Sequence, residues 1–128
     1  MVSRAVAEAA IEAARAAGVL LSPAVTAELQ KLPEDQRAAI AVAVGQISPD
    51  SGERVRFRSP RTGEQYRAIV PVNPDAPVVS YRPLKPEDKH GHGFLVTGLI
   101  DRRTWDGYKA ADGAGVLDSA LGRLVTES

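Results

Sequence analysis

In the stretch RVRFRSPRTGEQYRAIVPV, residues 54–72, apolar residues recur at every second position before a turn, a pattern typical of β-strands. In RVRFR, Val55 and Phe57 fall on one face of a strand and three arginines fall on the other. SPRTGEQ predicts a turn, and YRAIVPV predicts a second strand. The stretch therefore predicts a hairpin with an arginine-bearing face, formed by Arg54, Arg56 and Arg58.

Downstream of this hairpin the sequence predicts two more strands, VVSYRPL at 78–84 and FLVTGLI at 94–100, joined by the loop KPEDKHGHG. Pro71 and Pro83 predict a sheet edge, a bulge or a strand end at their positions. Asp101 then caps a short helix, in which Trp105 is expected to anchor the C-terminal part of the chain to the core or to an interface. VLDSALGRLVTES predicts a final amphipathic helix.

Upstream of the hairpin the sequence predicts helices. SRAVAEAAIEAARAAG consists of good helix formers with a thin, mostly alanine stripe, and GVLL predicts a short edge strand. Ser22 before Pro23, and Pro33 before two acids, start two further helices that break near Lys31 and end between Gly45 and Pro49. The spacing of Ile40, Val44 and Ile47 places the second of these helices on the core.

The element order predicts the α+β class, with a helical hairpin packed on a small twisted antiparallel sheet. We expect the helices to cover one face of this sheet and the arginines to occupy the other. The chain is interpreted as a single domain, 1–128, with an N-terminal helical extension at 1–18, a core at 19–110 and a C-terminal helix at 111–128.

Charge is segregated along a chain whose formal net charge is zero. Residues 51–110 carry eleven basic and seven acidic side chains, whereas acids exceed bases on both flanks. This distribution suits a middle region that binds a polyanion, although a solvated strand face explains it equally well. The absence of cysteine favours a reducing cytoplasm, and the apolar runs are too short to span a membrane.

A resemblance to a known family emerges at this point. The segment ELQKLPEDQRAAI, followed by a basic hairpin, GEQYRAIVPV, VVSYRPL and a late DRRTWDGY, resembles the RelE/ParE toxins of bacterial toxin–antitoxin systems across about residues 19–110. The resemblance implies a twisted sheet with a basic concave face. RelE-like members cleave messenger RNA on the ribosome without a metal, and ParE-like members poison DNA gyrase.

Site residues follow from the resemblance position by position. Arg67 occupies the family's YR position and Tyr108 that of a late tyrosine, while the late basic residue matches either Arg82 or the pair Arg102 and Arg103. Phosphate neutralisation is the role this implies for the arginines, because a planar guanidinium matches phosphate oxygens. The remaining expected nucleic-acid contacts are Arg54, Arg56, Arg58, Arg61, Lys85 and Lys89.

The chain departs from the family in its extra N-terminal helix, its longer KPEDKHGHG loop, its final helix and its few lysines. His90 and His92 lie in that loop, and three interpretations of their role are open: metal ligand, catalytic acid or base, and solvated loop residue. Two ligands at this spacing are too few for a metal without an acid, so we expect no metal and no cofactor. His92 is a candidate acid or base, and the remaining reading is a solvated Gly-rich loop.

The leading prediction is a ribosome-dependent mRNA endonuclease that inhibits translation, is neutralised by a cognate antitoxin and works away from membranes. The alternative is a protein-binding module of the same fold, either gyrase-directed or catalytically silent. Tyr66 and Tyr81 are expected either to stack on bases or to sit half-buried in the sheet. The sequence contains no phosphate-binding GxxxxGK, no HExxH and no nucleophile elbow.

Overall fold

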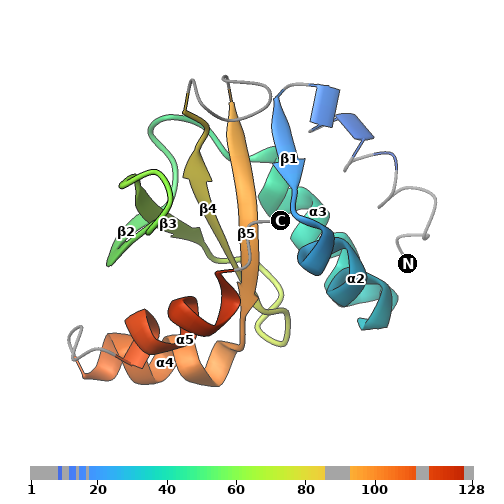
Figure 1. The fold of residues 1–128 in the computed structure, drawn as a ribbon. Helices are drawn as coiled ribbons and strands as arrows, with labels where there is room; N and C mark the ends of the chain where they lie inside the picture. Colours follow the sequence, from blue (N-terminus) through green and yellow to red (C-terminus); the bar gives the residue numbers. More distant parts are fainter. Residues whose placement is uncertain are drawn as a thin grey trace.

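The computed structural model describes residues 9, 12–13, 15–16, 18–85, 93–111 and 116–125. Residues 9, 12, 13, 15 and 16 are helical and exposed. The elements that follow are β1 (Val19–Leu21), α2 (Pro23–Lys31), α3 (Glu34–Gly45), β2 (Glu53–Arg58), β3 (Gln65–Ile69), β4 (Val78–Pro83), β5 (Phe94–Ile100), α4 (Arg102–Ala110) and α5 (Val116–Leu124). This is the α+β class that the sequence predicts (Figure 1).

The sheet has five strands in the order β1-β5-β4-β3-β2. Strands β2 to β5 form the predicted antiparallel meander, and β1 adds to β5 in parallel, with Leu20 opposite Leu95. The short edge strand that GVLL predicts is therefore confirmed, and its parallel pairing makes the sheet mixed. Strand β2 forms the opposite edge.

The predicted helix boundaries follow the capping residues. The Ser22 hydroxyl accepts from the Val25 amide at the start of α2, with Pro23 at the first helical position. Asp101 accepts from the Thr104 amide at the start of α4, as expected. Strand β4 ends at Pro83, and β3 ends before Pro71, because proline cannot donate to a sheet ladder.

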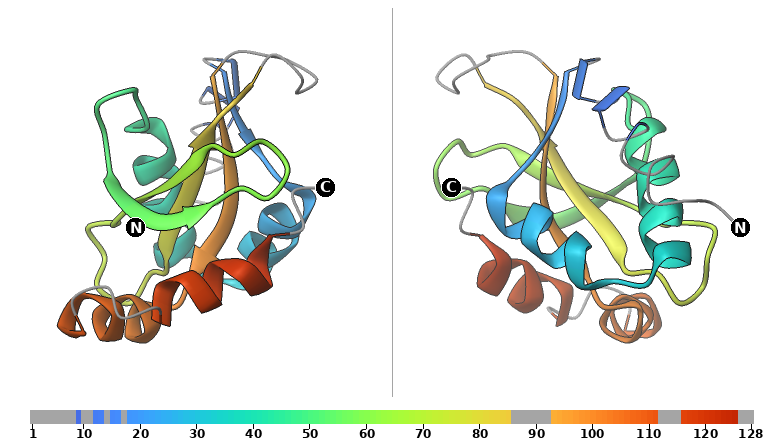
Figure 2. Two further views of the ribbon diagram at one scale, coloured as in Figure 1. Left: turned by 60° about the vertical axis from the view of Figure 1, so that its left-hand side comes forward. Right: turned by 90° about the vertical axis from the view of Figure 1, so that its right-hand side faces the viewer.

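Helices cover both faces of the sheet, so the expectation of one helical face and one open face is wrong. Helices α2 and α3 pack against Val79, Tyr81 and Val96 on one face. Helices α4 and α5 enclose a second core with Trp105 and Leu117 on the other, and the two pairs lie apart in Figures 1 and 2. The reason is that strands β4 and β5 are buried on both faces, which the alternation in β2 alone does not reveal.

Most of the residues predicted to lie in the core are buried. Ile40, Val44 and Ile47 are all buried, and Trp105 is 4% exposed, as a core anchor should be. In α5, Leu117, Ala120 and Leu121 are buried and Val116 is exposed. In the described part of the chain, no helix is long and apolar enough to cross a membrane.

Candidate nucleic-acid interface

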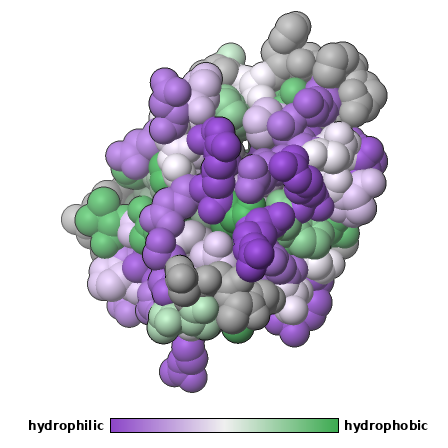
Figure 3. Space-filling model, turned by 90° about the vertical axis from the view of Figure 1, so that its left-hand side faces the viewer, coloured by the Kyte–Doolittle hydropathy of each residue, from purple (hydrophilic) through white to green (hydrophobic). Residues whose placement is uncertain are grey.

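Strand β2 presents a row of arginines to solvent. Arg54, Arg56 and Arg58 are exposed, whereas Val55 is buried and Phe57 packs against the core beneath α5. These arginines lie on the face of β2 opposite the one that α5 contacts. The predicted alternation is therefore confirmed, and Figure 3 shows strongly hydrophilic side chains gathered on the side of the molecule that the β2–β3 hairpin forms.

Arg67 joins this row from the neighbouring strand. It pairs with Arg54 across the β2–β3 ladder and with Tyr81 across the β3–β4 ladder, so all three side chains share one face. Arg67 is half-buried, and its Nη1 donates to the Ser51 carbonyl at 3.1 Å. We call Arg54, Arg56, Arg58 and Arg67 the arginine face.

The connection between α3 and β2 is fixed beneath Arg67. The Tyr81 hydroxyl donates to the Ser51 carbonyl at 2.7 Å and lies 2.8 Å from the Ser51 hydroxyl. Burial of Tyr81 raises the pKa of its phenol above 10.0, an effect that the Ser51 hydrogen bond and the Arg67 charge only partly oppose. Tyr81 is therefore a neutral donor at physiological pH. Ser51 was not among the site residues expected from the sequence, because a serine in a turn has no feature that would distinguish this role.

Nearby acids are matched by lysines. Glu53 accepts from Lys109 at 2.7 Å, and Glu64 forms an ion pair with Lys85. Residues 53–67 contain five arginines against these two glutamates. Since the two lysines offset the two glutamates, residues 53–67 contribute a local excess of positive charge. Lys85, expected as a phosphate contact, lies beside Glu64, and its contact with phosphate stays a prediction.

The turn between β2 and β3 carries two of the expected contacts. Arg61 is exposed in this turn, and Arg58 donates to the Gly63 carbonyl at 3.2 Å. The Ser59 hydroxyl accepts from the amides of Arg61 and Thr62, which shapes the turn. Arg61 therefore extends the basic surface beyond the end of β2.

The other residues implied by the resemblance do not meet Arg67. Arg82 follows Tyr81 in the same strand, so it points to the opposite face, where it is 0% exposed and donates to its neighbour's carbonyl at 2.9 Å. Tyr108 packs against the α4–α5 core, with its ring 5.6 Å from that of Trp105. Arg103 is exposed on α4. The expected set is therefore divided between the two faces of the sheet.

The tyrosines are not available for base stacking. Tyr66 and Tyr81 are both 0% exposed. Tyr66 stacks on Phe57 at 5.3 Å, and Tyr81 meets Phe94 edge-on at 5.8 Å. Both rings belong to the two cores, so the stacking interpretation is wrong and the half-buried one understates their burial.

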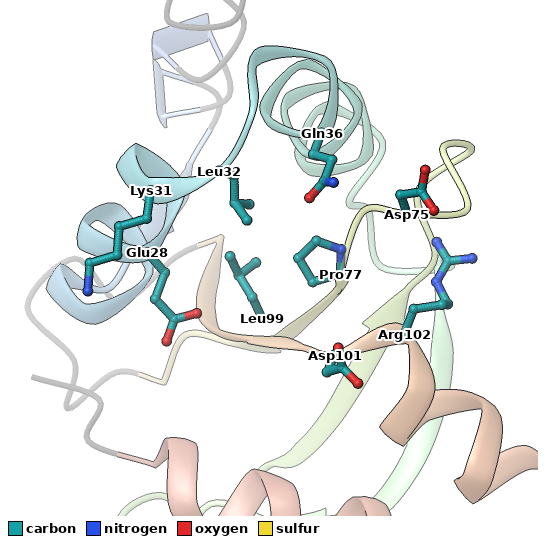
Figure 4. A pocket seen from close by; sticks show the side chains of 9 residues that line it. All are labelled: Glu28, Lys31, Leu32, Gln36, Asp75, Pro77, Leu99, Asp101 and Arg102. Atoms are coloured by element: carbon teal, nitrogen blue, oxygen red, sulfur yellow. The ribbon is translucent and has the colours of Figure 1, made fainter.

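A pocket of about 360 Å³ lies away from the arginine face, between the end of α2, the start of α3 and the start of α4 (Figure 4). Leu32, Pro77 and Leu99 supply its apolar lining. Arg102 borders it and donates to the carbonyls of Pro71 and Asn73 at 3.1 and 3.0 Å. Arg102 thus holds the β3–β4 connection to α4, and its expected phosphate contact stays a prediction.

His90, His92 and Lys89 lie outside the described residues, so their expected roles stay predictions. Among the residues that the structure places, no three His, Cys, Asp or Glu side chains form a group able to hold a metal ion. The functional groups that the described residues bring together on the arginine face are cationic hydrogen-bond donors.

No protein-family model, curated protein or solved structure matches this chain.

Proposed function

We propose that this protein is a RelE/ParE-like toxin that binds single-stranded RNA through the arginine face and inhibits translation in the cytoplasm by cleaving messenger RNA on the ribosome. The observation that carries the proposal is the arginine face itself, in which Arg67 lies beside the exposed Arg54 on a strand pair at the sheet edge. Guanidinium groups at an accessible edge can contact successive phosphates of an extended strand.

The element order supports the toxin class. The helical pair α2–α3 followed by the antiparallel meander β2 to β5 agrees with the helical hairpin and twisted antiparallel sheet that the resemblance implies. Fold alone does not fix function, so the proposal rests on the arginine face and the fold together. A cognate antitoxin that folds across the toxin is the partner this class requires.

Cleavage without a metal proceeds by attack of a ribose 2′-oxygen on the adjacent phosphorus, which yields a 2′,3′-cyclic phosphate and releases the 5′-oxygen. A base takes the 2′-hydroxyl proton, and an acid returns a proton to the leaving oxygen. Arg67 is assigned the third task, neutralising charge on the phosphorane. Tyr81 does not serve as the base because its raised pKa keeps the phenol protonated. His92 is the candidate acid or base.

Induction in growing cells tests the toxin activity. We expect wild-type protein to arrest growth and to leave new ribosome-phased mRNA ends, and Arg67→Ala to abolish both. Arg123→Gln on α5 is the matched control, since Arg123 is exposed but lies on an element that packs on the opposite sheet face. Absence of arrest by well-folded protein would contradict the toxin proposal.

The second candidate is the protein-binding module, acting on gyrase or on another protein without catalysis. The placement of Arg82 and Tyr108 away from Arg67 favours it, because fewer of the expected catalytic groups can meet one phosphate. Growth arrest with intact messages would select this candidate over the nuclease.

A further inference from the structure

We propose that Tyr81 and Ser51 are positioning residues that hold the Arg67 guanidinium in place for phosphate binding. This inference rests on the proposed RNA-binding function of the arginine face. Both residues hold the same guanidinium, and this role cannot be predicted from a tyrosine or a serine in the sequence.

A single carbonyl oxygen connects the three residues. The Ser51 carbonyl accepts from the Tyr81 hydroxyl at 2.7 Å and from Arg67 Nη1 at 3.1 Å. Tyr81 and Arg67 are direct cross-strand partners on neighbouring strands. The position of the guanidinium therefore depends on where the connection between α3 and β2 holds the Ser51 carbonyl.

The connection is itself closed by hydrogen bonds. The Ser51 hydroxyl donates to the Ser48 carbonyl at 2.9 Å and accepts from the Ser48 amide at 2.8 Å. Gly52 then passes so close to the sheet that an added Cβ would lie 2.3 Å from the Tyr81 hydroxyl oxygen. Ser51 is thus clamped between a tight turn and the buried phenol.

The clamp leaves most of the guanidinium available. A guanidinium has five N–H donors, and the Ser51 carbonyl takes one from Arg67. The remaining donors of the half-buried side chain lie beside the exposed Arg54, its partner across the β2–β3 ladder. An arginine fixed in this way loses less conformational freedom when it binds an anion.

A double-mutant cycle tests the coupling, with anisotropy of a fluorescently labelled single-stranded RNA as the readout. We expect Tyr81→Phe to weaken binding by about three- to ten-fold in the wild-type background, because the ring stays packed while the hydroxyl is lost. In an Arg67→Gln background the same change should have no further effect. In an Arg54→Gln background, the matched control, the full effect should persist. Equal losses in all three backgrounds would overturn the proposal.

A second measurement does not depend on RNA. Relaxation of the Arg67 Nε–H signal by NMR should report an ordered side chain in the wild type and a mobile one in Tyr81→Phe and Ser51→Ala. An equally mobile or equally ordered signal in all three proteins would overturn the positioning role. If the wild type fails to bind RNA while Arg67 still loosens in the variants, the proposed function is wrong and the positioning role stands.

Discussion

Tyr81 and Arg82 are neighbours in the chain, yet their side chains lie on opposite faces of the sheet. The Tyr81 ring belongs to the core under α2 and α3, and its hydroxyl reaches the Ser51 carbonyl. Arg82 points the other way and is fully buried. Burial places the two polar groups in structural roles, whereas Arg67 on the neighbouring strand keeps its access to solvent.

We expect the Tyr81 phenol to make the folded protein less stable at alkaline pH. Because burial raises its folded-state pKa above the ordinary 10.0, the folded protein holds this proton more tightly than the unfolded chain does. The stabilisation is fully present below pH 10 and is lost as the pH rises through the folded-state pKa. Urea unfolding at several alkaline pH values should show this decline in the wild type and a shallower one in Tyr81→Phe. Parallel profiles would contradict the assignment.

Substitution of Arg82 should affect stability and leave RNA binding intact. Arg82→Ala removes a long, fully buried side chain, and we expect the free energy of unfolding to fall by about 2–4 kcal/mol. At a temperature where the variant remains folded, its RNA affinity should equal that of the wild type. A loss of affinity without a loss of stability would place Arg82 at the RNA after all.

At the scale of elements, the connection between α3 and β2 determines how the arginine face is held. Residues 46–52 leave α3, turn through the Ser48–Ser51 hydrogen bonds and enter β2 with Gly52 in the left-handed region at φ 73°. The turn between β2 and β3 contains Gly63 with the same φ but with open space around it. The two glycines therefore share a backbone conformation and differ only in their surroundings.

Replacing each glycine by alanine should separate strain from crowding. Gly63→Ala should cost about 1–2 kcal/mol for the left-handed conformation alone. Gly52→Ala should cost more, since its Cβ would meet the Tyr81 hydroxyl oxygen at 2.3 Å and the Ala68 carbonyl at 2.8 Å. Urea denaturation of both variants measures the difference, and equal costs would show that the connection moves freely away from Tyr81.

At the scale of the whole molecule, one sheet carries two cores. The core under α2 and α3 contains Ile40, and the core under α4 and α5 contains Leu121 and Trp105. Strands β4 and β5 contribute side chains to both cores, so we expect the loss of either core to be transmitted to the other through the strands.

Cavity mutations in the two cores should therefore lower a single unfolding transition. Ile40→Ala and Leu121→Ala should each cost about 2–5 kcal/mol. Trp105, the only tryptophan, reports by fluorescence on the second core, and far-UV circular dichroism reports on the whole chain. Coincident midpoints in Ile40→Ala are expected, whereas a Trp105 transition that stays at the wild-type midpoint would show that the cores unfold independently.

Salt dependence provides the whole-molecule test of RNA binding, because the net charge is zero and any attraction must come from the local field. Each phosphate contact on a single strand contributes about 0.7 to the slope of log K against log salt. Removing two contacts in Arg54→Gln/Arg58→Gln should reduce the slope by about 1.4. Titrations across a salt series measure it, and an equal reduction in Arg123→Gln would show that binding is not localised to the arginine face.

The α+β class, the strand positions, the helix starts at Ser22 and Asp101 and the exposed arginines of β2 could all be predicted from the sequence. Each of these depends on local features, namely side-chain alternation, capping and proline, which act within a few residues. The site residues that the resemblance implies were also named from the sequence alone. The sequence did not show which of them lie close together in space.

Which of those residues lie together depends on the tertiary structure. The register between β2 and β3 places Arg67 beside Arg54. The register between β3 and β4 places Tyr81 opposite Arg67, so that the next residue, Arg82, lies buried on the other face of the sheet. The second helical layer, the parallel return of β1 to β5 and the contact of Ser51 with Tyr81 all join segments far apart in the chain. Local propensity carries no information on such pairings, because their free energy comes from burial and hydrogen bonds that form only when the whole sheet is assembled.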